Sequence, residues 1–104
     1  MRTLMKITVP VESGNQGIKD GSLESTIQGL MKRLTPEAAY FYPENGHRTM
    51  LMVFDLKSPA DLPTITEPLF MDLNASVEMV PVMNVEDLKK GLSAMIEHRG
   101  AARH

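Results

Sequence analysis

The sequence predicts a single α+β domain, and three of its features support this. Its 104 residues suffice for one hydrophobic core but not for two. Apolar residues alternate with polar ones in four short segments, which is the pattern of β-strands, and recur every three to four residues in three longer segments, which is the pattern of helices. In chain order these segments read strand, helix, strand, strand, helix, strand and helix.

The first strand is predicted at Arg2–Val9, where apolar side chains occupy every second position. A helix follows and ends at Thr35-Pro36, because the residue before a proline avoids the helical conformation. Gly17 and Gly21 weaken its first part, since each glycine costs about 1 kcal/mol relative to alanine. Its apolar stripe consists of Leu23, Ile27, Leu30, Met31 and Leu34.

Two strands, at 38–42 and 48–56, are predicted to form a hairpin. Asn45-Gly46 lies between them, and this dipeptide favours a type I′ turn because both of its central positions need a positive φ. Directly opposed residues share a face of the sheet, so the turn also fixes the register. The expected pairs are Glu44 with His47, Tyr42 with Thr49, Phe41 with Met50, and Tyr40 with Leu51.

The second helix is predicted to begin at Ser58-Pro59-Ala60-Asp61, with serine as the N-cap and proline in the first turn. Pro68 should kink or restart it near Glu67. A fourth strand is predicted at 74–83, and its Pro81 fits an edge strand. Asn84 then caps a last helix. The apolar stripe of that helix consists of Val85, Leu88, Leu92, Met95 and Ile96. Residues 1–98 are expected to form the domain, and 99–104 a flexible tail.

This order of elements is that of a ferredoxin-like sandwich, βαββαβ, here with an added C-terminal helix. Such a sheet is antiparallel, has the strand order 4-1-3-2 and carries helices on one face. The more uniformly apolar face of the predicted sheet suits the helices, and comprises Met5, Ile7, Val9, Phe41, Met50, Met52, Phe54, Val77 and Met79.

The other face of the predicted sheet is also largely apolar, with a few polar side chains. It comprises Leu4, Lys6, Thr8, Tyr40, Tyr42, Leu51, Val53, Asp55, Ser76, Glu78, Val80 and Val82. Exposing it would leave a larger apolar patch than monomers usually tolerate. We therefore expect a homodimer in which a two-fold axis packs this face against its copy.

The closing stretch Val77–Met83, VEMVPVM, followed by Asn84–Leu88, NVEDL, resembles small bacterial members of the dimeric α/β barrel superfamily. The resemblance implies two ferredoxin-like subunits packed sheet to sheet. It also implies a small organic ligand held between helices and sheet or inside the barrel. Relatives include muconolactone-isomerase-like proteins, cofactor-free and haem-degrading monooxygenases, and stress-induced barrel proteins. The histidine-bearing helix of the haem-degrading group has no counterpart here, because His47, His98 and His104 lie elsewhere.

Composition excludes several classes of function. A net charge of −2 and a pI near 5.9 give no electrostatic basis for binding nucleic acid. No apolar run approaches the roughly 20 residues that span a membrane, and no secretory signal is recognisable, so a cytoplasmic protein is expected. The chain has no cysteine, and its three histidines are not spaced as metal-binding pairs, so no metal or other cofactor is expected.

Six residues are candidates for ligand contacts. Lys6 and Glu78 fall on one face of neighbouring strands, as a charge pair that either orients a ligand or serves as a structural salt bridge. On the same face, the phenols of the tyrosines either bind a ligand or simply bridge a buried and a wet environment. His47 and Arg48 would lie at the rim of a pocket. The full set is Lys6, Tyr40, Tyr42, His47, Arg48 and Glu78.

Two functions of different class remain open at this point. One is a small-molecule binding protein or cofactor-independent enzyme acting on an apolar, cyclic or aromatic metabolite. The other is a non-catalytic dimerisation module in which the same residues serve only the interface. The feature that separates them is empty space, since a ligand site needs a cavity of roughly 300 Å³ with converging polar groups.

Overall fold

The computed structural model describes residues 1–102, and the side chains of residues 1–100. It contains one antiparallel sheet of four strands, with the order β2-β3-β1-β4, or β4-β1-β3-β2 from the other edge. The strands are β1 (Arg2–Val9), β2 (Ala38–Glu44), β3 (His47–Asp55) and β4 (Ser76–Pro81). The α+β class predicted from the sequence is confirmed.

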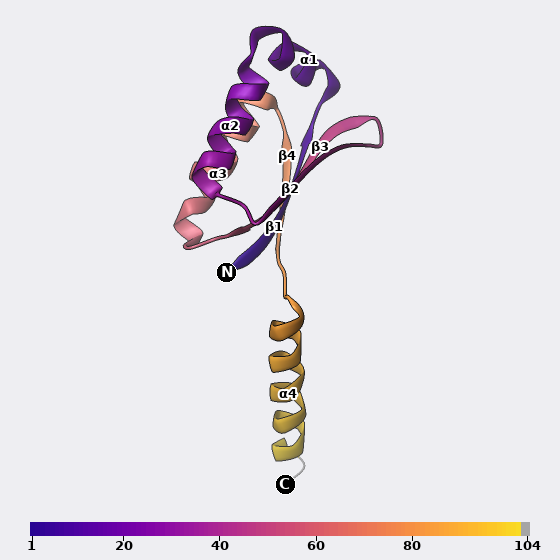
Figure 1. Ribbon diagram of the computed structural model, residues 1–104, viewed down its shortest axis with the longest axis vertical. Coiled ribbons are helices and arrows are strands. Elements are labelled where there is room, and N and C mark those ends of the chain that lie inside the picture. The colour runs from indigo at the N-terminus through magenta and orange to yellow at the C-terminus, as the bar shows by residue number, and fades with distance from the viewer. Residues whose placement is uncertain (103–104) are drawn as a thin grey trace.

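Three helices lie on one side of this sheet, and a fourth projects from its end (Figure 1). The three are α1 (Val11–Asp20), α2 (Ser22–Leu34) and α3 (Leu62–Leu73), and a short 3-10 turn, η1 (Pro59–Asp61), leads into α3. The projecting helix is α4 (Val85–Ala102). It runs through the first four residues of the segment expected to be a tail, and His104 lies outside the described residues.

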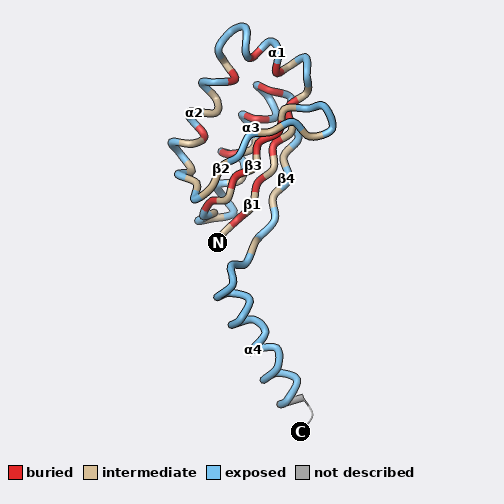
Figure 2. Tube along the Cα trace, turned by 45° about the vertical axis from the view of Figure 1, so that its right-hand side comes forward, coloured by how far each residue is buried: buried red, intermediate tan, exposed pale blue. Residues whose placement is uncertain are grey.

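The core lies between the three helices and the sheet (Figure 2). Along β1 burial alternates strictly, and Met5, Ile7 and Val9 are completely buried. This alternation follows from the two-residue period of a strand with only one covered face. The helices contribute Leu23 and Leu30 from α2, and Ile65, Leu69 and Leu73 from α3.

The hairpin has the predicted register in every pair, including Tyr42 opposite Thr49 and Tyr40 opposite Leu51. Asn45 and Gly46 both have positive φ angles, 52° and 77°, as a type I′ turn requires. Pro81 ends β4 at the edge of the sheet, where the missing N–H of a proline costs no ladder hydrogen bond.

The single helix predicted before Thr35 is in fact two helices, which is a correction. Gly21 separates α1 from α2 with a φ of 80°, a left-handed conformation that glycine adopts without steric cost. Gly17 stays inside α1, buried against Leu23 at the start of α2. The weak glycine-rich stretch of the sequence is therefore a sharp corner between two helices.

Pro68 does not end α3, although the sequence suggested a kink or restart at Glu67. A proline at this position leaves the carbonyl of Thr64 without its helical partner. Arg33 of α2 donates a hydrogen bond from Nη1 to that carbonyl oxygen at 2.9 Å. The contact between the two helices therefore compensates for the donor that proline lacks.

Phe41 is the one residue of the predicted helix-covered face that is largely exposed, at 53%, so its predicted burial is wrong. It belongs to the edge strand β2, and the helices pack over the other strands and over Ala39 of β2 instead. The helix side of β2 is consequently left open at Phe41.

The last helix begins at a well-formed cap. The backbone N–H of Asp87 donates to Oδ1 of Asn84 at 2.8 Å, and the N–H of Asn84 donates to Oδ2 of Asp87 at 3.1 Å, which is a reciprocal capping box. From this start α4 leaves the body, giving the molecule a longest extent of 65 Å. Every described side chain of α4 is exposed. Within residues 1–102 no helix combines the length and apolar character needed to cross a membrane.

Replacing Leu69 by alanine should destabilise the protein by about 2–5 kcal/mol, because a buried leucine leaves both lost transfer energy and a cavity. Leu69 is 1% exposed, at the centre of the contact between α3 and the sheet. Met71, two residues further along the same helix, is 72% exposed, and its replacement by alanine should change stability by no more than about 0.5 kcal/mol. Urea denaturation measures both changes. Equal losses would show that α3 is not packed on the sheet as described.

Candidate functional site

An apolar groove opens beside the edge strand, at the end of the sheet that carries the hairpin. It lies between α1 and α2 on one side and β2 and β3 on the other, and its volume is about 440 Å³. It exists because the helices leave Phe41 uncovered while their own apolar residues face across toward it. The lining residues are Val9, Ile18, Leu23, Ile27, Phe41, Tyr42, Pro43, Arg48, Thr49 and Met50.

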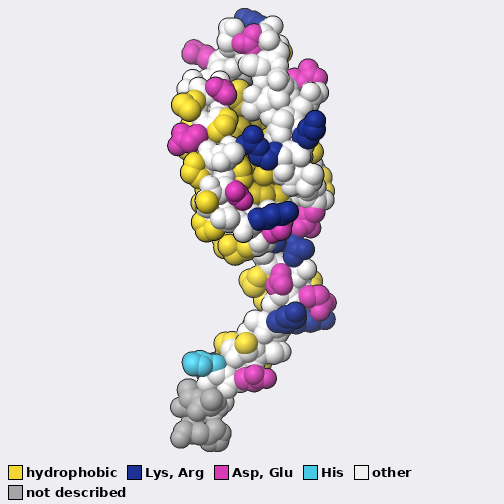
Figure 3. All heavy atoms as spheres, turned by 90° about the vertical axis from the view of Figure 1, so that its left-hand side faces the viewer, with side chains coloured by type: hydrophobic (Ala, Val, Ile, Leu, Met, Phe, Trp, Pro, Cys, Tyr) yellow, Lys and Arg dark blue, Asp and Glu magenta, His cyan; other side chains and the backbone are white. Residues whose placement is uncertain are grey.

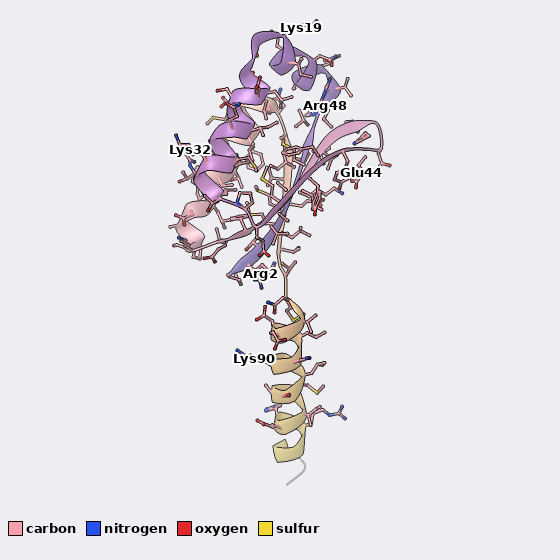
Figure 4. All side chains as sticks on the ribbon, viewed as in Figure 1. Arg2, Lys19, Lys32, Glu44, Arg48 and Lys90 are labelled. Atoms are coloured by element: carbon pink, nitrogen blue, oxygen red, sulfur yellow. The ribbon has the colours of Figure 1, made fainter. Side chains whose placement is uncertain are left out.

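Arg48 contributes the positive charge of this groove and is held firmly in place. Its guanidinium donates to Oδ1 of Asn15 at 3.0 Å and to the carbonyl oxygen of Val11 at 3.3 Å, both in α1 (Figure 4). Gly14 makes this approach feasible, since a Cβ there would meet Nη1 of Arg48 at 2.5 Å. No acidic partner of Arg48 is found among the described residues, so its charge is not neutralised by an ion pair.

A second polar group lies on the face of the sheet that no helix covers. The ammonium of Lys6 forms an ion pair with Oε2 of Glu44, and the phenol of Tyr42 donates to Oε1 of the same carboxylate at 3.3 Å. The hydrogen bond between the two side chains and the attraction of their opposite charges lower the pKa of Glu44 and raise the pKa of Lys6. Both charged side chains are about one-third exposed, so the pair is partly shielded from water.

Lys6 and Glu78 lie opposite each other in the sheet, as expected, but their side chains do not form the expected ion pair. The two residues are directly opposed across β1 and β4. The ammonium of Lys6 nevertheless bonds to Glu44, which lies two strands away on β2. Glu78 is exposed, and its carboxylate makes no ion pair or hydrogen bond within the described part of the chain.

The remaining candidates lie at different places. Tyr40 is on the uncovered face, 66% exposed, and is two residues away from the polar group at Tyr42. His47 is exposed in the hairpin turn, with Nδ1 3.0 Å from the carbonyl oxygen of Asn45, and forms no ion pair with the opposing Glu44. Of the six candidates, the structure therefore brings Arg48 and Tyr42 to the groove, and Tyr42 and Lys6 to the polar group.

A further hollow, of about 680 Å³, lies at the opposite end of the sheet, where α4 begins. Its walls carry an ion-pair network: Arg2 joins Glu37 at 2.6 Å and Asp87 at 3.4 Å, and the terminal ammonium of Met1 joins Asp55 at 2.6 Å. These contacts raise the pKa of Arg2 and lower that of Asp55. Because the charges are already paired, the network ties α4 to the sheet and offers little to a ligand.

Sequence reasoning missed the role of Gly14 and Asn15 in positioning Arg48. A signal was available: Gly14 and Gly17 are three residues apart in one helical segment, and a glycine lets another group approach the backbone closely.

The described residues contain no cluster of three or more histidine, cysteine, aspartate or glutamate side chains that could hold a metal ion. The sequence matches no protein-family model and no curated protein. The groove and the uncovered faces are therefore the features from which a function can be inferred.

The ion pair between Lys6 and Glu44 predicts a pH dependence of stability. A carboxyl group whose pKa is lowered by folding stabilises the protein at neutral pH, and this contribution is lost as the pH falls through the lowered pKa. Glu44→Gln should therefore have a lower melting temperature than the wild type at pH near 7, and the difference should vanish in strong acid. Thermal melts across this pH range provide the measurement.

Glu78→Gln is the matched control, because Glu78 also faces Lys6 but forms no ion pair with it. We expect it to melt like the wild type throughout the pH range. If Glu78→Gln reproduced the loss seen for Glu44→Gln, the partner of Lys6 would be Glu78 instead.

Proposed function

We propose that this protein is a ferredoxin-like homodimer of the α/β barrel type that binds a small apolar molecule, cyclic or aromatic, with an acidic substituent. The observation that carries the proposal is the groove beside β2, whose apolar lining includes one fixed guanidinium without an acidic partner. Its volume of about 440 Å³ falls within the range of ligand pockets, roughly 300–1,000 Å³.

The chemistry of the ligand follows from the lining. Phe41, Ile18 and Ile27 would contact a flat or cyclic hydrocarbon part, and burial of apolar area would supply most of the affinity. Arg48 would bind a carboxylate or a similar oxyanion with paired N–H groups, the geometry that a guanidinium provides best. Arg48 also fixes the direction of the ligand, because Asn15 and Val11 fix the guanidinium.

The groove is proposed as a binding site for this ligand and not as a catalytic site. No histidine, aspartate or glutamate lines the groove within the described residues, and general acid–base catalysis usually depends on such a group. Tyr42 borders it, but its phenol lies on the other face of the sheet, where it donates to Glu44.

The dimer is supported by the uncovered face of the sheet. The order β4-β1-β3-β2 and the helices on one side support the ferredoxin-like part of the proposal. On the other side the apolar residues remain only half-buried or are exposed, and a copy of the same face would cover them by the self-complementary packing of a two-fold interface. The residues concerned are Leu4, Leu51, Val53, Val80 and Val82.

A second candidate function is a non-catalytic dimerisation module. It is favoured by the same uncovered face together with α4, whose apolar side chains up to Ile96 are all exposed. Under this interpretation the groove would bind no metabolite. A direct binding measurement separates the two.

The fluorescent probe 1-anilinonaphthalene-8-sulfonate, an aromatic anion, should bind the native protein in the groove. Phe41→Asp should weaken its binding at least about tenfold, since 1.4 kcal/mol corresponds to that factor and the substitution removes an aromatic contact while adding a like charge. Arg48→Gln should weaken it as well. Fluorescence titration gives the dissociation constants.

Phe70→Asp is the control, because Phe70 is also an exposed aromatic residue but belongs to α3, outside both the groove and the uncovered face of the sheet. It should leave probe binding unchanged. Near-ultraviolet circular dichroism must show native packing in each variant, because partly folded states also bind this probe. Equal losses at positions 41 and 70 would place the probe elsewhere and contradict the ligand site.

Charge placed on the uncovered face should dissociate the dimer. Val80→Asp and Leu51→Lys each put an unpaired charge where the two copies are proposed to meet, and a buried unpaired charge is strongly unfavourable. Light scattering at micromolar concentration should give the mass of one chain for these variants and of two for the wild type. Gln28→Asp, on the exposed side of α2, serves as the control and should remain dimeric. A monomeric wild type would rule out the dimer.

A further inference from the structure

The apolar stripe of α4 has no partner among residues 1–100, whose side chains the structure describes. Leu88, Leu92 and Met95 are 44%, 48% and 43% exposed, and Val85 and Ile96 are exposed further. At 100° per residue these five side chains fall within one arc of about 100°, while Glu86, Lys90 and Glu97 lie on the opposite side. Figure 3 shows hydrophobic side chains on α4 between the charged ones. A helix with so clear an apolar face normally buries that face.

The groove beside β2 is an apolar hollow on the body of the same chain, and it too is incomplete. One of its long sides is open, with Ile18 57% and Phe41 53% exposed. A shallower hollow of about 270 Å³ continues it along α1 and α2 through Ile18, Leu23 and Ile27, and Glu24 borders that part. The two hollows together form an elongated apolar surface with an acidic margin.

The α4 helix of one chain cannot cover the groove of that chain. The groove lies at the corner formed by the β2 edge and the hairpin, since Val9 pairs with Arg48 there. By contrast, α4 leaves from the β4 edge at the other end, where Pro81 pairs with Thr3. These two corners lie on one diagonal of the sheet, and α4 points away from the body (Figure 1). The eight residues of β1 alone separate the two ends by about 26 Å.

A two-fold dimer through the uncovered face brings the two corners together. An axis that lies between the sheets and follows the other diagonal exchanges the β4 corner of one copy with the β2 corner of its partner. The strands of the two sheets then cross at a steep angle, which is one of the two packing modes of sheets. The connection Val82–Asn84 would then lie at the β2 edge of the partner's sheet. The groove opens on the helix side of that edge, so α4 would swing about this connection to reach it and would give up the ion pair of Asp87 with Arg2.

We propose that α4 of one copy lies over the groove of the second copy, with its apolar stripe forming the missing wall of the ligand site. Charge complementarity at one margin supports this occupant: Lys89 flanks the stripe, and Glu24 borders the smaller hollow. Arg99 would have to lie clear of Arg48, which has the same charge. The length also fits, since the 18 residues of α4 span about 27 Å, more than the roughly 20 Å of α2, which lines both hollows. The inference rests on the proposed function in that the groove is taken as a ligand site.

Cysteine cross-linking tests the contact directly, because the native chain contains no cysteine. Leu92→Cys and Ile18→Cys are placed on separate chains, which are purified and then mixed. Each chain has a single cysteine, so a mixed disulfide can only join two copies. The control replaces Leu92→Cys by Ala94→Cys, which lies on the same helix but faces the opposite direction. The Leu92 and Ile18 variants should link at least about tenfold faster than the control pair, because neighbouring groups react at a high effective concentration.

Equal rates for the two pairs would overturn the inference, whether or not the groove binds a ligand. Leu92→Glu supplies the second measurement, since Leu92 is remote from the ion-pair network that anchors α4. If α4 is a wall of the site, this variant should bind 1-anilinonaphthalene-8-sulfonate at least about tenfold more weakly, and Ala94→Glu should not. Unchanged binding in Leu92→Glu would refute the role of α4 as a wall. Fast cross-linking with no probe binding in the wild type would instead refute only the proposed ligand site and leave the contact between copies established.

Discussion

The structure depends on one imbalance: the sheet has two apolar faces, and α1, α2 and α3 cover only one of them. Burial of Met5, Ile7 and Val9 against these helices provides the core of the domain. On the opposite face, Leu4, Leu51 and Val53 remain partly exposed to water. Since each buried side chain of this kind contributes roughly 1.5–3 kcal/mol, the uncovered face is a large reserve of binding energy for a second copy.

The groove is a consequence of the same limited coverage. The helices cover β2 only in part, at Ala39, so Phe41 near the hairpin has no cover on the helix side. Gly14 lets Arg48 lie flat against α1, which places a fixed cation at the margin of an otherwise apolar surface. A guanidinium held by neutral oxygens keeps its full charge available, and this distinguishes Arg48 from Arg2, whose charge is shared between Glu37 and Asp87.

These features connect the proposals for dimer, ligand and α4. The uncovered face, the open groove and the exposed stripe of α4 are three apolar surfaces of one small chain, and a diagonal two-fold axis would cover all three at once. The polar group of Lys6, Glu44 and Tyr42 would then lie inside the dimer, where the ion pair already neutralises its charges. Burial of a paired lysine and glutamate is far less costly than burial of either alone.

The sequence by itself determined the local structure of this protein. Strand periodicity placed β1, the Asn45-Gly46 turn set every pair of the hairpin, and Asn84 with Asp87 began α4, because each of these depends on residues close together in the chain. The tertiary structure decided which partners meet across the fold. Lys6 pairs with Glu44 and not with Glu78, since a long flexible side chain can reach past its directly opposed neighbour. Only the tertiary structure shows Phe41 uncovered and Arg33 bonded to Thr64, because both depend on where whole helices pack on the sheet.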